Sequence, residues 1–84
     1  MPTFMDVHEN LPEGVTGKDV AQAHKADLEK QGAYGVKYLR YWVDEKDRKA
    51  FCLVEAPDAE TANRVHREAH GLVADRIFEV VEGD

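Results

Sequence analysis

Two histidines four residues apart, His66 and His70, are the part of this chain best suited to chemistry. They lie in the run Val-His-Arg-Glu-Ala-His-Gly, which is typical of the last turn of a helix. Residues i and i+4 share one helix face, so both imidazoles can reach a single point. Neutral imidazole is a good ligand for Zn, Cu, Ni and Fe. A histidine at the end of a helix also interacts favourably with the helix dipole and needs no metal, so the pair alone is a weak metal motif.

The other two histidines each have a carboxylate neighbour. His8 shares a strand face with Asp6, and His24 precedes Asp27 by three residues on one helix face. A carboxylate beside a histidine can ligate a metal or fix the tautomer of a ligating imidazole. The same histidines would also be ordinary as surface or partly buried residues. The candidate metal ligands are therefore His66, His70, His8, His24, Asp6 and Asp27.

The single cysteine, Cys52, lies inside an apolar run, so no intrachain disulfide can form. We expect it to be a small core residue, because buried cysteines usually behave as small hydrophobes. As a metal ligand it would make a site softer, and more suited to zinc or copper.

Composition places the chain among small globular proteins. It has 84 residues, 43% hydrophobic and 33% charged, so we expect one domain over residues 1–84. The net charge is −6, which argues against a nucleic-acid partner and is compatible with binding cations. Neither a signal peptide nor a long apolar run is visible. We therefore expect a soluble cytoplasmic protein with no membrane partner.

The hydrophobic pattern predicts six elements: a strand over 3–8, a helix from Thr16 to about Gln31, strands over 36–43 and 50–55, a helix from Asp58 to Gly71, and a strand over 77–81. Thr16 followed by Asp19 resembles a capping box, and Gly71 is placed as a C-cap. The first helix should turn inward Val20, His24, Asp27, Leu28 and Gln31. The order β-α-β-β-α-β predicts an α+β ferredoxin-like fold, with a four-stranded antiparallel sheet and two helices on one face.

The predicted hairpin is apolar on both sides. Strict alternation places Val36, Tyr38 and Trp42 on one side, and Leu39, Tyr41 and Val43 on the other. Two helices can cover only one face, and an exposed sheet face normally alternates apolar with polar residues. An apolar exposed face usually marks an interface. We therefore predict a homodimer through the open sheet face.

Enzymatic motifs are lacking: the sequence has no Gly-rich phosphate loop, no nucleophile elbow and no P-loop. An enzyme remains an alternative, as a small dimeric protein of the α/β-barrel type that uses a cavity between two sheets. Its candidate residues would be Asp6, His8, Tyr38 and Arg40. A third alternative is a structural or regulatory dimer whose histidines are incidental.

Two segments carry a resemblance to a known family. They are Phe-Cys-Leu-Val-Glu-Ala-Pro-Asp at 51–58 and His-Arg-Glu-Ala-His-Gly at 66–71. Nearly the whole chain resembles a family of small bacterial ferredoxin-like proteins with nickel-binding or nickel-responsive members. The resemblance implies a ferredoxin-like fold, a homodimer and Ni²⁺ bound by at least some members, and all four histidines match histidine positions of the family. The leading hypothesis is a dimeric nickel-binding protein for sequestration or metal response, with His66 and His70 as ligands.

Overall fold

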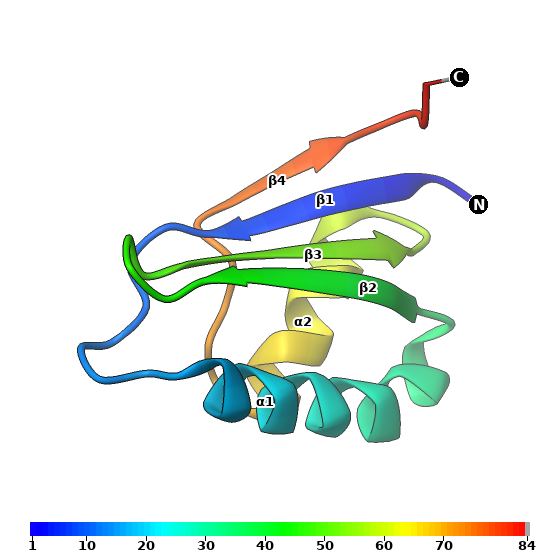
Figure 1. Cartoon of the computed structure of the whole chain (residues 1–84). Helices are drawn as coiled ribbons and strands as arrows, with labels where there is room; N and C mark the ends of the chain where they lie inside the picture. The colour runs from blue at the N-terminus through cyan, green and yellow to red at the C-terminus, as the bar shows by residue number, and fades with distance from the viewer. Residues whose placement is uncertain (84) are drawn as a thin grey trace.

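The computed structural model describes residues 1–83 and contains the six predicted elements in the predicted order. Their bounds are β1 (Thr3–His8), α1 (Gly17–Lys30), β2 (Lys37–Asp44), β3 (Lys49–Glu55), α2 (Ala59–Ala69) and β4 (Arg76–Glu79), with a short 3₁₀ turn η1 (Gln31–Tyr34) after α1. The strands form one antiparallel sheet in the order β2-β3-β1-β4. Both helices lie on one side of this sheet (Figure 1). The ferredoxin-like α+β prediction is confirmed.

The helix starts follow from side-chain caps that the sequence predicts. The Thr16 hydroxyl accepts a hydrogen bond from the backbone N–H of Asp19, whose carboxylate accepts one from the Thr16 N–H. The Asp58 carboxylate accepts a hydrogen bond from the backbone N–H of Thr61 at 2.7 Å, which starts α2. Past the end of α2, Gly71 has a φ of +83°, which glycine adopts without steric cost. None of the helices within residues 1–83 is long and apolar enough to cross a membrane.

A β-bulge in β2 overturns the predicted alternation of the hairpin. The register with β3 shifts between Tyr38 and Arg40, which leaves Leu39 as an extra residue. An extra residue reverses the face of every side chain that follows it. Tyr38 is consequently buried on the same side as Tyr41, whereas Trp42 is 48% exposed. The prediction that Tyr38 and Trp42 share a face was wrong.

The same bulge separates the residues of the enzyme alternative. Asp6 and His8 are buried on the helix side of β1, where Tyr38 contacts Asp6. Arg40 is exposed and lies on the opposite face. A cavity between two open sheets could therefore not be lined by all four residues.

The interior combines an apolar core with a buried polar cluster. The core residues are Phe4, Val36, Tyr38, Cys52, Val54, Ala56, Ala62 and Val65, with a smaller group formed by Leu11, Val20 and Ala50. Four polar residues are buried as well: Asp6, His8, Asp27 and His66. Asp27 occupies the inward position of α1, and its neighbour Leu28 is 43% exposed, so the prediction that Leu28 turns inward was wrong. Charged groups are rarely buried unless they are paired, so this cluster must supply its own partners.

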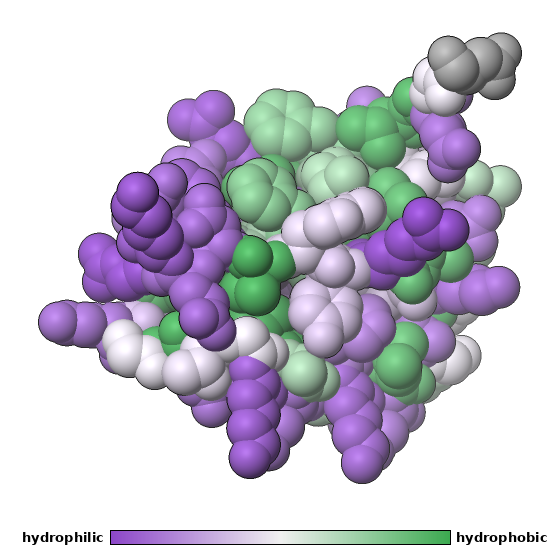
Figure 2. All heavy atoms as spheres, viewed as in Figure 1, coloured by the Kyte–Doolittle hydropathy of each residue, from purple (hydrophilic) through white to green (hydrophobic). Residues whose placement is uncertain are grey.

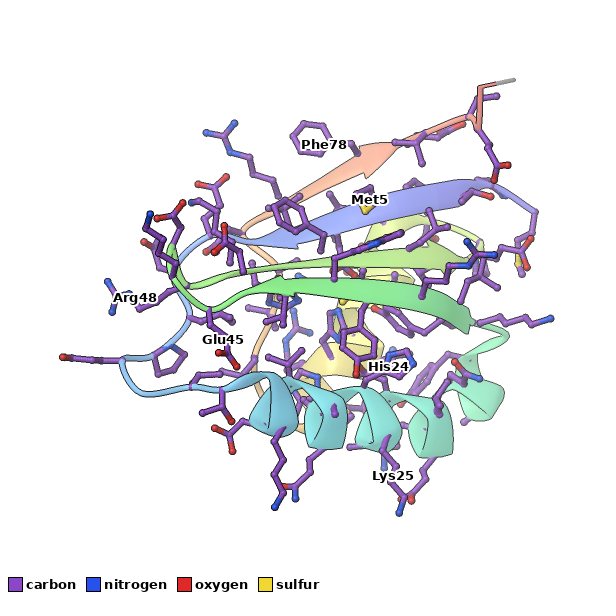
Figure 3. All side chains as sticks on the ribbon, in the orientation of Figure 1. Met5, His24, Lys25, Glu45, Arg48 and Phe78 are labelled. Carbon is purple, nitrogen blue, oxygen red and sulfur yellow. The ribbon has the colours of Figure 1, made fainter. Side chains whose placement is uncertain are left out.

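The sheet face away from the helices is largely apolar. Its larger apolar residues are Met5, Val7, Leu39, Trp42, Phe51, Leu53 and Phe78. Figure 2 shows hydrophobic and weakly polar residues gathered over the strands, with hydrophilic residues around them. Met5 and Phe78 face each other across the β1–β4 pair on this side (Figure 3). The face is called the open face below.

Candidate metal centre

His66 is the centre of the buried polar cluster and joins three elements of the fold. It belongs to the last turn of α2 and is 1% exposed. Its Nε2 lies 2.9 Å from Oδ2 of Asp6 in β1, and its Nδ1 lies 2.9 Å from Oδ1 of Asp27 in α1. The imidazole of His66 therefore links α2 to β1 through Nε2 and to α1 through Nδ1.

On the Nε2 side, four donor residues converge and are called the inner set: Asp6, His8, Cys52 and His66. One ligand atom from each lies within 4.8 Å of all the others, and all four residues are buried. The Nε2 of His8 lies 3.4 Å from Oδ1 of Asp6. Cys52 pairs with Asp6 across the β1–β3 ladder, so the thiol and the carboxylate are neighbours on one face. The inner set thus draws three donors from the sheet and one from α2.

On the Nδ1 side, three donor residues form the outer set: Asp27, His66 and His70. Oδ1 of Asp27 lies 2.9 Å from Nδ1 of His66 and 3.1 Å from Nε2 of His70. His70 is the C-cap of α2, and its side chain is 13% exposed. The predicted convergence of His66 and His70 is thus present, with a carboxylate oxygen near both rings.

A cavity of about 70 Å³ adjoins the cluster on the α1 side. Its polar lining includes His8, His24, Asp27, Cys52, His66 and His70, and its apolar lining includes Leu11, Val15, Val20 and Tyr41. In Figure 3, His24 points from α1 toward the sheet, whereas its neighbour Lys25 points away. His24 packs on the Tyr41 ring with centroids 4.6 Å apart. Of the six predicted ligands, five belong to the two sets, and His24 lines the cavity without joining either set.

Electrostatics explain how the cluster tolerates burial. Burial alone would raise the pKa of Asp6, but the hydrogen bond from His66 and the nearby imidazole of His8 outweigh it and lower the pKa to about 2. Burial likewise disfavours a charged His66, but hydrogen bonds to Asp27 and Asp6 raise its pKa to about 11. In the metal-free protein His66 is therefore an imidazolium between two carboxylates. A divalent cation that binds a ring nitrogen of His66 must therefore displace the proton from that nitrogen.

Two further residues of the cluster were not among the predicted ligands. The Tyr38 hydroxyl lies 3.2 Å from Oδ2 of Asp6 and 3.0 Å from Nε2 of His66, and it donates to the backbone carbonyl of Ala62 at 2.9 Å. Burial raises the pKa of the Cys52 thiol to about 11. Cys52 is a core residue, as expected, yet it also lies within the inner set. The cross-strand pairing of Cys52 with Asp6 places it there, and this register is set by how β1 and β3 pair and not by a local sequence motif.

Unpaired atoms test whether these residues suit a cation. Within residues 1–83, three buried side-chain atoms have no hydrogen-bond partner: Oδ1 of Asp6, Nδ1 of His24 and Nε2 of His70. Buried polar atoms nearly always have a partner. Two of the three belong to a donor set, and Nε2 of His70 is close to Asp27 but out of line for a hydrogen bond. The residues present fit a divalent metal ion.

Comparisons with known proteins agree with the resemblance seen in the sequence. Residues 4–80 match the family described as nickel-responsive protein SCO4226-like. A similar solved structure is the crystal structure of SCO4226 from Streptomyces coelicolor A3(2), at 39% identity and a TM-score of 0.88, covering 98% of this chain and 99% of that one. Among curated proteins, none matches. The chain therefore belongs to the SCO4226-like family of nickel-responsive proteins.

Proposed function

We propose that this protein binds Ni²⁺ through the outer set, Asp27, His66 and His70, and serves nickel sequestration or nickel response. The observation that carries the proposal is the position of one Asp27 oxygen, which lies 2.9 Å and 3.1 Å from imidazole nitrogens of two histidines. Imidazole with carboxylate is a donor combination that borderline divalent metals accept. Membership of a family named for nickel response supports nickel as the metal.

The cavity beside the outer set favours nickel over a metal that needs a closed site. Three protein donors leave coordination positions open, and water can fill them. A cavity of about 70 Å³ has room for several waters, since one water needs roughly 10–15 Å³ measured in this way. The outer set would thus hold Ni²⁺ with two imidazoles, one carboxylate and water.

Sequestration is favoured over a role as a nucleic-acid-binding sensor. The chain has 17 acidic and 11 basic side chains and a net charge of −6, whereas binding to nucleic acid depends on a basic surface. The proposed role is therefore to hold nickel, with any response passed on by other proteins. The cytoplasmic location stays a prediction from the sequence.

Calorimetric titration of the metal-free protein with Ni²⁺ tests the proposal. The wild-type protein should bind saturably, and His70→Ala and Asp27→Asn should each bind roughly 10- to 100-fold more weakly or not at all. Arg67→Ala is the matched control, because Arg67 is exposed on the same turn of α2 and belongs to neither set. Unchanged Ni²⁺ affinity in both His70→Ala and Asp27→Asn would refute the outer set as the site.

We also propose that the protein is a homodimer through the open face. Trp42 and Phe78 are 48% and 49% exposed there, which is unusual for large aromatic residues on a monomer. Arg40 and Glu55 lie on the same face, so a two-fold axis lets opposite charges of two copies meet. Light scattering of the wild type should give twice the chain mass, and Trp42→Asp should give the monomer. Leu28→Asp, which changes an exposed leucine of α1, is the control that should stay dimeric.

A further inference from the structure

The inner set is a donor group that the proposed nickel site does not use, apart from the shared His66. Its members Asp6, His8, Cys52 and His66 are 0%, 6%, 6% and 1% exposed. They bring together a carboxylate, a thiol and two imidazoles, with one ligand atom of each inside a 4.8 Å limit. Such a mixture has no structural need to be buried, because apolar side chains of similar volume pack as well or better.

We infer that the inner set is a second metal site, one that takes a thiophilic divalent ion of the Zn²⁺ class. The inference deepens the proposed metal-binding function and depends on it only through His66. Four protein donors including sulfur are enough to fill the four positions of a structural zinc site without water. The outer set, with three donors beside a cavity, is open instead. The two sides of one imidazole thus suit two different kinds of metal.

Strand pairing holds three of the donors together before any metal arrives. Asp6 and His8 are two residues apart on the inward side of β1, and Cys52 is the direct partner of Asp6 in β3. Partners across an antiparallel ladder have Cβ atoms about 5 Å apart, so donors on these strands need little movement to meet at one ion. His66 adds the fourth donor from α2.

An unpaired oxygen points independently to a ligand here. Oδ1 of Asp6 is fully buried, and within the described part of the chain nothing hydrogen-bonds to it. It lies 3.4 Å from Nε2 of His8, which is close but not bonded. A buried carboxylate oxygen without a partner is costly, and a cation bound by this oxygen would satisfy it.

Asp27 has the position of an orienting group for this second site. Its Oδ1 lies 2.9 Å from Nδ1 of His66. If Nδ1 of His66 stays protonated and donates a hydrogen bond to Asp27, the lone pair of the ring lies on Nε2 and is directed at the inner set. Carboxylates that orient ligating histidines in this way are the usual outer partners of zinc sites.

Charge balance favours a divalent ion in this buried place. Asp6 supplies one negative charge, and Cys52 supplies another once a coordinating metal displaces its proton to solvent. With His8 and His66 neutral, a 2+ ion makes the inner set neutral overall. A neutral unit avoids the large penalty of an uncompensated buried charge.

Cobalt provides the test, because Co²⁺ occupies zinc sites and absorbs in the near ultraviolet when a thiolate binds it. Reduced, metal-free wild-type protein titrated with Co²⁺ should develop this charge-transfer band, and Zn²⁺ should abolish it. Cys52→Ser should lose the band and bind Zn²⁺ at least roughly 10-fold more weakly, while its Ni²⁺ titration stays like the wild type. His70→Ala is the matched control, which should keep the band and lose Ni²⁺ binding.

The outcomes separate this inference from the proposed nickel site. Absence of the band in wild type, or its survival in Cys52→Ser, overturns the inner set whatever Ni²⁺ does. Loss of Ni²⁺ binding in His70→Ala tests the outer set alone. X-ray absorption of the zinc-loaded wild type needs no variant, in case Cys52→Ser does not fold. A sulfur neighbour at about 2.3 Å supports the inference, and a shell of only nitrogen and oxygen overturns it.

Discussion

Replacing Asp27 with asparagine should destabilise the metal-free protein more than any exposed charge change on α1. Asp27 is 2% exposed, and its carboxylate lies 2.9 Å from the charged imidazole of His66. Asparagine has nearly the same shape and can still accept a hydrogen bond, but it carries no charge. Asp6 alone would then balance the positive charge of His66. The variant therefore isolates the electrostatic contribution of one buried ion pair.

The size of the effect follows from the burial of both partners. Removing one member of a buried ion pair typically costs about 3–5 kcal/mol, and we expect about 3 kcal/mol because the hydrogen bond survives. A chain of 84 residues has a total stability of roughly 4–13 kcal/mol. For a domain of this size a loss of 3 kcal/mol lowers Tm by roughly 12–24 °C.

Thermal unfolding followed by circular dichroism, in chelator at pH 6, measures the shift in Tm. Glu29→Gln is the control, because it removes the same charge from an exposed position two residues further along α1. Asp27 has a pKa below its ordinary value near 3.8, so its contribution is present above pH 3.8 and disappears as the pH falls. The difference in Tm between the wild type and Asp27→Asn should therefore become smaller below pH 3.8. If Asp27→Asn shifts Tm no more than Glu29→Gln, the ion-pair account of the cluster is wrong.

Three further predictions concern the same cluster. The pKa of His66 is raised from 6.5 to about 11. The charged imidazole therefore stabilises the metal-free protein fully below pH 6.5, and this stabilisation is lost as the pH rises toward 11. A Tm that stays constant between pH 6.5 and 10 would contradict this. Tyr38→Phe should cost about 1–2 kcal/mol in urea unfolding, because it removes the hydroxyl that bonds the carbonyl of Ala62 and contacts Asp6; an unchanged midpoint would show that the hydroxyl is not needed. A neutral imidazole coordinates through one nitrogen, so Zn²⁺ loading should weaken Ni²⁺ binding in calorimetry, and independent binding of both ions would exclude competition for His66.

Local sequence signals account for most of the fold. The capping box at Thr16 and Asp19, and the Asp58 cap, act within four residues of each helix start, so they are legible without any tertiary contact. The final strand is shorter than the predicted 77–81 and ends at Glu79. The sequence predicted the wrong sheet face for the β2 side chains beyond Leu39. The reason is that an extra residue in a strand is defined only by the register with the partner strand.

The candidate site divides in the same way. Residue type and spacing alone determined that His66 and His70 could act together on α2, and that Asp6 with His8 and His24 with Asp27 were pairs worth weighing. Only the tertiary structure decided that His66 contacts Asp27 and Asp6, which are 39 and 60 residues away in the chain. It also brought Cys52 into the cluster and left His24 on the cavity wall. The physical reason is that helix periodicity acts over a few residues, whereas these contacts depend on strand register and on how α1 and α2 pack on one face of the sheet.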